Sequence, residues 1–147
     1  MTGAPLLGGR DLAVGTTYRS PEYELTEDAI VEFAQQWDPQ YFHLDAQAAT
    51  ASPYGGLIAS GIQTMAVMQR LTVQEIYGAW KVIAGRALRE VEFLRPVRPG
   101  ARLHVRVRLD AVEVDDERGR ADVTSVSELL EGDRVMLRAV TEVVVHA

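Results

Sequence analysis

The C-terminal half of the chain alternates apolar and polar residues with a period of two. Such alternation is typical of β-strands with one buried face. It predicts three long strands, over about 101–114, 120–131 and 134–146. Gly119 and Gly132 lie in the short polar stretches between them, which favours a hairpin-linked antiparallel meander. A further strand is expected from Trp80 to Leu94, interrupted near 84–85.

The N-terminal half has helical spacing instead. Thr17 to Leu25 is rich in β-branched and aromatic residues and predicts a first strand, preceded by a loose lead-in over 1–12. Thr26 is suited to cap a helix that Pro39 ends. Its apolar positions recur at i, i+3, i+4 and i+7: Ile30, Phe33, Ala34 and Trp37. Asp45 is suited to cap a second, short helix that runs through Ala51.

The most apolar helix is expected from Ile62 to about Tyr77, with Gly78 after its last turn as a C-terminal cap. Its apolar residues are distributed around most of its circumference, which predicts a helix buried on nearly all sides. Long strands twist and curl, and a buried helix of similar length gives them a core. The sequence therefore predicts an α+β fold in which a curved antiparallel sheet wraps a central helix, as a single domain over 1–147.

Composition excludes several classes of function. The net charge of −6 argues against a nucleic-acid surface, because phosphate binding depends on clustered Lys and Arg. The chain has no cysteine, and its three histidines, His43, His104 and His146, lie far apart without zinc-ligand spacing, so we expect no metal. No run approaches the ~20 apolar residues of a membrane span, and no secretory signal is recognisable. We expect a cytoplasmic protein that has no membrane or nucleic-acid partner.

The candidate chemistry lies in the stretch from Asp38 to His43 and in the later glycine Gly61. A carboxylate and an imidazole five positions apart on a turn can converge on one small molecule. The N–H groups of a helix that begins at a glycine can face an anionic oxygen. An Asp and a His at this spacing are, taken alone, more often an ordinary turn residue and a half-buried histidine. With Gly61 added, the set has the outline of a site that adds or removes water beside a carbonyl.

The residues also resemble a known family, the MaoC-like dehydratases and (R)-specific enoyl-CoA hydratases of the hot-dog fold. The resemblance runs from Asp11-Leu12-Ala13-Val14-Gly15, through the stretch from Asp38 to His43 and Gly56-Leu57-Ile58-Ala59-Ser60-Gly61, to residues 91–100. The family's Asp-x-Asn-Pro-x-His signature is matched at both ends by Asp38 and His43. The chain departs from it at Gln40, at the shifted Pro39, and at Ser60, where the family often has histidine.

The resemblance implies a reaction and its participants. Asp38 and His43 would be the acid–base pair that hydrates a trans-2-enoyl thioester to a 3-hydroxyacyl thioester, and the Gly61 N–H would form the oxyanion hole. No cofactor is implied, because CoA or acyl carrier protein enters only as part of the substrate. A homodimer is implied as well. We expect the substrate to be contacted by Gln40, Phe42, Ser60 and Met65, with Ser60 also capping the central helix.

Two other functions remain open at this point. The first is a hot-dog acyl-CoA thioesterase; many of these use a carboxylate on the central helix, where this sequence has none between Ile62 and Gln74. The second is a non-catalytic acyl-binding or partner subunit. Arg102, Arg106 and Arg108 form a basic stripe, which we interpret as a strand face that is either solvated or paired with acidic residues such as Glu113 and Asp122.

Overall fold

The three C-terminal strands form the centre of the sheet. In the computed structural model, which describes residues 3–147, they are β4 (Ala101–Asp115), β5 (Arg120–Glu131) and β6 (Arg134–His146). The hairpins pair them antiparallel, and the full order is β1-β4-β5-β6-β3, with β2 also paired to β4. Their inward positions are almost all buried, as the alternation requires. The predicted meander is confirmed, with boundaries within one residue of those expected.

The edge strands differ more from expectation. The predicted first strand is two short strands, β1 (Thr17–Arg19) and β2 (Tyr23–Leu25), because Pro21 between them has no N–H for the ladder. β3 (Val82–Phe93) is continuous, so the expected interruption near 84–85 is wrong. Bulges absorb the irregularity there instead.

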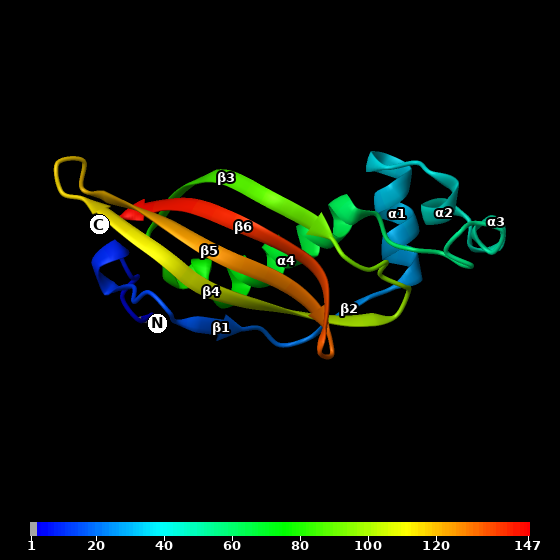
Figure 1. Ribbon diagram of the computed structural model, residues 1–147, viewed down its shortest axis with the longest axis horizontal. Coiled ribbons are helices and arrows are strands. Elements are labelled where there is room, and N and C mark those ends of the chain that lie inside the picture. The colour runs from blue at the N-terminus through cyan, green and yellow to red at the C-terminus, as the bar shows by residue number, and fades with distance from the viewer. Residues whose placement is uncertain (1–2) are drawn as a thin grey trace.

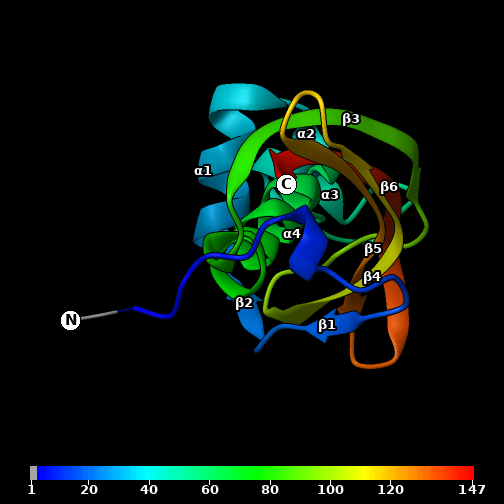
Figure 2. The same cartoon turned by 90° about the vertical axis from the view of Figure 1, so that its left-hand side faces the viewer.

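The long helix α4 (Gly61–Glu75) lies in the hollow of the sheet, and Figure 2 shows the strands curling around it. A helix wrapped by a curved antiparallel sheet is the hot-dog arrangement, which confirms the predicted fold class. The prediction that this helix is buried on nearly all sides is wrong, however, because Ile62 and Val73 are 56% and 42% exposed. Gly78 is not a cap after the last turn: α4 ends at Glu75, and a separate 3-10 turn, η2, covers Tyr77–Ala79.

The segment between β2 and α4 forms a helical cluster at the end of the molecule where α4 begins (Figure 1). It contains α1 (Glu27–Trp37), α2 (Tyr41–Leu44) and α3 (Ala46–Ala49). Thr26 caps α1 by accepting from the Ala29 N–H, and Asp45 caps α3, so both predicted caps are confirmed. α2 was expected only as a turn.

The lead-in is less loose than expected. Residues 1 and 2 lie outside the described part. Leu7 forms backbone hydrogen bonds to Ala79 and Lys81, and Leu12 is buried after a 3-10 turn, η1 (Gly9–Asp11). The segment from Leu7 onward therefore packs beside η2 and against β4 and β5, and Leu12 joins the core.

The basic stripe has other partners than those expected. Arg102 pairs with Glu22, Arg106 with Glu128, and Arg108 with Asp110. Strand register decides the partner of Arg106, which lies directly across from Glu128. Burial would raise the pKa of Glu128, but hydrogen bonds from Arg106 and Arg138 outweigh it and lower that pKa.

Candidate active site

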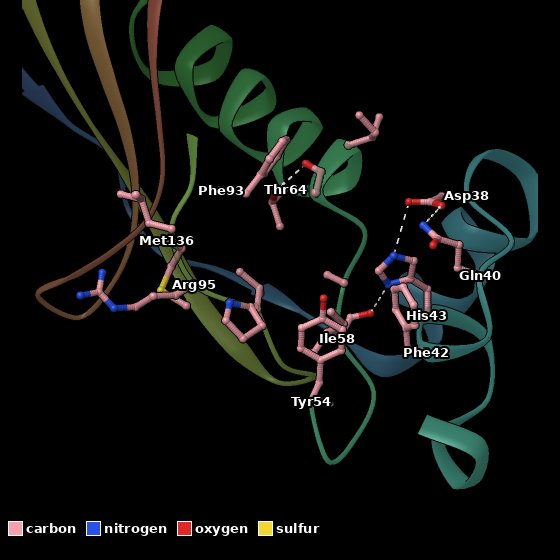
Figure 3. A pocket seen from close by; sticks show the side chains of 16 residues that line it. Asp38, Gln40, Phe42, His43, Tyr54, Ile58, Thr64, Phe93, Arg95 and Met136 are labelled. Carbon is pink, nitrogen blue, oxygen red and sulfur yellow. Dashed lines mark hydrogen bonds and ion pairs between the residues drawn. The ribbon is translucent and has the colours of Figure 1, made fainter. Parts of the chain in front are cut away.

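A cavity of about 530 Å³ lies where the helical cluster meets the start of α4 and the end of β3. Figure 3 shows its side chains converging from these elements. The residues lining it include Asp38, Gln40, Phe42, His43 and Gly61. We call this cavity the reaction chamber. The structure therefore brings together, on one chamber, the acid, the base and the glycine that the sequence singled out.

Asp38 follows α1, and its N–H bonds to the Ala34 carbonyl, which fixes where its side chain starts. Ser60 Oγ donates to Asp38 Oδ2 at 2.7 Å, and Gln40 Nε2 donates to Oδ1 at 2.8 Å. The Ser60 hydrogen bond, then that of Gln40, lower the pKa of Asp38 against a smaller opposing effect of burial. The carboxylate is thus ionised at neutral pH and held on both oxygens.

His43 is 4% exposed and is oriented by a backbone carbonyl. Its Nδ1 lies 2.7 Å from the oxygen of Ile58, so Nδ1 must carry a hydrogen to donate there. Nε2 then faces Asp38 Oδ2 at 3.4 Å, as Figure 3 shows. With a neutral imidazole both facing atoms are acceptors, so this approach is favourable only with a donor between them. A water molecule or a proton on Nε2 meets that need.

Gly61 is the first residue of α4, so its N–H has no acceptor within the helix. Ser60 Oγ caps the helix by accepting from the Ile62 N–H at 3.2 Å. The partial positive charge of the helix start adds to the donor strength of these N–H groups. The chamber therefore offers a hydrogen-bond donor suited to an anionic oxygen, close to a carboxylate and an imidazole.

Of the four residues predicted to contact the substrate, Gln40 and Phe42 line the reaction chamber, whereas Ser60 and Met65 do not. Phe42 lines the chamber, with its ring centroid 4.6 Å from that of His43 and 5.4 Å from that of Tyr54. Gln40 lines it too, but its amide is used on Asp38. Ser60 is fully buried behind the carboxylate, and it is not among the residues that line the chamber. Met65 is on a separate cavity of about 250 Å³ further along α4.

Sequence reasoning missed two features of the chamber. One is the Ile58 carbonyl that orients His43, which no side-chain pattern reveals because it is a backbone atom. The other is Phe93, whose ring lies against Gly61. Phe93 stands within the stretch that carries the family resemblance, and the available signal was a large aromatic residue near the end of an expected strand.

Two features are absent from residues 3–147. Within that range no group of three or more His, Asp or Glu side chains is placed to hold a metal ion. None of the helices in it has the length and apolar character needed to cross a membrane.

Comparison with known proteins assigns the chain to a family. A family model described as a MaoC-like domain matches residues 11–131. A crystal structure of a MaoC-like dehydratase from Rhodospirillum rubrum is 38% identical, with a TM-score of 0.85 over 95% of this chain and 97% of that one. The (R)-hydratase from A. caviae involved in PHA biosynthesis has a TM-score of 0.72 at 19% identity over 94% and 99% of the two chains, which shows the shared fold alone.

Sequence relatives point the same way. The 3-hydroxyacyl-thioester dehydratase Z of Mycobacterium tuberculosis is 34% identical over 92 residues, which are 60% of each protein. A Bacillus subtilis protein of unknown function, YdeM, is 34% identical over 89 residues, which are 60% of this chain and 63% of that protein. The matched regions thus span about three fifths of these curated relatives.

Proposed function

Because this chain belongs to the family of MaoC-like domains, we propose that it catalyses the reversible hydration of a trans-2-enoyl thioester to an (R)-3-hydroxyacyl thioester. The observation that carries the proposal is the approach of His43 Nε2 to Asp38 Oδ2 across 3.4 Å, on a chamber that Gly61 also lines. The name of the M. tuberculosis relative, a 3-hydroxyacyl-thioester dehydratase, supports the same reaction class.

In this mechanism one water molecule sits between Asp38 and His43. The two hydrogen bonds that Asp38 already accepts make its carboxylate the weaker base, so His43 Nε2 takes the proton as the water oxygen attacks C3. The Ile58 carbonyl and the Asp38 carboxylate both stabilise the imidazolium that forms. His43 then returns the proton to C2, which completes the addition of water.

The thioester carbonyl gains negative charge when C3 is attacked. We propose that the Gly61 N–H donates to this oxygen, assisted by the dipole of α4. A donor in this role typically contributes ~3 kcal/mol to the transition state. Every step is a proton transfer or the making of a C–O bond, so the proposal requires neither metal nor redox cofactor. CoA or acyl carrier protein takes part only as the carrier of the acyl group.

The test follows the absorbance of an enoyl thioester as water is added. Asp38→Asn and His43→Ala should each lower kcat by on the order of 10²–10⁴-fold, because each removes a group in contact with the water. Circular dichroism and thermal unfolding check that each variant is folded. Phe33→Leu, on α1 and outside the chamber lining, is the control and should retain activity. Equal rates in the wild type and both site variants would refute the assignment.

Thioester hydrolysis is the nearest alternative reaction, and the chamber disfavours it. Asp38 is the one carboxylate among the described residues that line the chamber, and it directly follows α1 and is not on the central helix. The first carboxylate in α4 is Glu75, its last residue. A thiol reagent distinguishes the reactions: release of free thiol faster than loss of the enoyl absorbance would favour the thioesterase. Ligand binding without any turnover would favour the non-catalytic subunit.

We also propose that the chain forms a homodimer through β3. This edge strand is exposed at almost every position, and the adjoining side of α4 presents Ile62 and Val73 to solvent. A long exposed edge is prone to pair with another strand, and a two-fold pairing of β3 with its copy satisfies both chains. Light scattering should give about twice 16.2 kDa. A particle of monomer mass across the micromolar range would contradict the dimer.

A further inference from the structure

A bulge in β3 changes which face its last residues occupy. Leu88 pairs with Thr141 and Phe93 with Leu137. These two partners lie four residues apart on β6, and their side chains therefore share the inner face. Leu88 and Phe93 are five residues apart, a spacing that would put them on opposite faces of a regular strand. The extra residue between Arg89 and Glu92 restores the phase, so both side chains face α4.

The bulge depends on an unusual backbone conformation. Glu90 has a φ of +49°, which is the left-handed region that a residue with a Cβ seldom adopts. Strain of this kind persists where the surrounding structure enforces it, and it occurs often at functional sites. Its effect here is to aim the Phe93 ring at the first residue of α4.

The ring fills the space beside Gly61. A Cβ placed on Gly61 would lie 2.7 Å from Phe93 Cε1 and 2.8 Å from Cδ1, closer than van der Waals contact permits. Phe93 also lines the reaction chamber together with Thr64 and Met136, as Figure 3 shows.

Two further cavities, of about 250 and 380 Å³, lie against β3 further along α4, and neither shares a lining residue with the reaction chamber. They share Leu88 and Thr141 among their lining residues, so they form one groove along α4. Met65 and Met68 line the cavity of about 250 Å³, and flexible thioether side chains adapt well to hydrocarbon. Thr64 lines the chamber and the next residue, Met65, lines the groove, so the two are neighbours along α4, and Phe93 lies on the chamber side of this boundary.

We propose that Phe93 is a specificity-determining residue that restricts the acyl group to short chains by closing the chamber toward this groove. The inference rests on the proposed function, because it takes an acyl thioester as the ligand. A thioester carbonyl at the Gly61 N–H lies next to the ring. The polar carrier needs an open route to solvent, whereas the groove suits hydrocarbon. The tail must therefore pass Phe93, and a long tail is stopped there.

Binding of saturated acyl-CoAs tests this independently of turnover, since a saturated chain has no double bond to hydrate. Isothermal titration would compare butyryl-CoA with decanoyl-CoA on the wild type and on Phe93→Ala. The wild type should not prefer the longer chain. In Phe93→Ala each methylene that enters the groove should tighten binding about fourfold, so the preference for decanoyl-CoA should rise at least about tenfold. Phe93→Leu, a milder truncation, should move the preference in the same direction.

Two controls locate the effect. Ile83 is an apolar residue of the same strand with 46% exposure, and it is not among the residues that line these cavities. Ile83→Ala should leave the preference unchanged. Leu88→Ala should matter only in the Phe93→Ala background, where the groove is open, and should reduce the gain there.

The outcomes separate this inference from the proposed reaction. An unchanged chain-length preference in a folded Phe93→Ala variant, or a wild type that already prefers decanoyl-CoA, overturns the role of Phe93 even if hydration is observed. A shifted chain-length preference without enoyl hydration supports the specificity role of Phe93 and refutes the proposed hydratase reaction. Failure of every variant to bind either acyl-CoA overturns both.

Discussion

Replacing Ser60 by alanine should remove two interactions at once. Ser60 Oγ accepts from the Ile62 N–H and donates to Asp38. Loss of an N-cap costs about 1 kcal/mol of unfolding free energy. Loss of a hydrogen bond to a charged group costs about 1.5–3 kcal/mol, and we take the lower value because Asp38 is partly exposed to water. Ser60→Ala should therefore lower the unfolding free energy by about 2.5 kcal/mol.

Thr26→Ala is a matched control. Thr26 caps α1 by accepting from the Ala29 N–H at 3.2 Å, and it does not touch Asp38. The distance equals that of the Ser60 cap, although the donor is the third residue after the cap and not the second. Urea unfolding at pH 7 should give a loss of about 1 kcal/mol for this variant. The difference between the two variants, about 1.5 kcal/mol, isolates the hydrogen bond to the carboxylate.

That difference should depend on pH. Ser60 lowers the pKa of Asp38 in the folded protein, below its ordinary 3.8. The stability that a lowered carboxylate pKa provides is present above the unfolded value and is lost as pH falls through the folded one. The two variants should therefore converge as urea unfolding is repeated from pH 5 to pH 3. Equal losses at pH 7, or a difference that does not shrink in acid, would refute the reasoning.

Substitutions at three other positions are informative. Glu128→Gln should lower the unfolding free energy by about 1–3 kcal/mol at neutral pH, because the two arginines that lower the pKa of Glu128 lose their charged partner. In urea unfolding this loss should shrink as pH falls below about 4.5. Gly61→Ala should destabilise the wild type, because its Cβ meets the Phe93 ring, but in the Phe93→Ala background it should be neutral or stabilising by up to about 1 kcal/mol. Additive changes in a double-mutant cycle would rule out this contact. Glu90→Gly should raise the unfolding free energy by about 0.5–1 kcal/mol, and Glu90→Val should lower it. If the φ of residue 90 is not positive, the two variants should not differ in this way.

The regular parts of the fold were predictable because local chemistry determines them. Alternation placed the three central strands, and the caps at Thr26 and Asp45 follow from side chains that bond N–H groups two or three residues on. The spacing of Asp38 and His43 likewise predicted their meeting, since a short stretch of chain joins them. In each case the relevant partners are near neighbours in sequence.

What the sequence did not predict depends on register or on distant backbone. Periodicity cannot tell which apolar positions of α4 the sheet covers, so the exposure of Ile62 was missed. The phase change at Glu90 follows from pairing with β6, and the partner of Arg106 follows from pairing with β5. The bond between Ser60 and Asp38 joins residues 22 apart, which only the packing of α1 against α4 determines.

The helical cluster at one end of the molecule has its own attachments (Figure 1). The Gln63 amide bonds to the Ala29 carbonyl of α1, the Ile58 N–H to Phe42, and the Ala59 N–H to Val97. These hydrogen bonds tie the cluster to α4 and to the connection after β3. None of them belongs to the central ladder of β4, β5 and β6. The cluster can therefore open as a cooperative unit while that ladder stays closed. In hydrogen exchange, the Ile58 and Ala59 amides would then exchange with a common opening free energy, below that of the sheet, and a bound acyl thioester would slow both together.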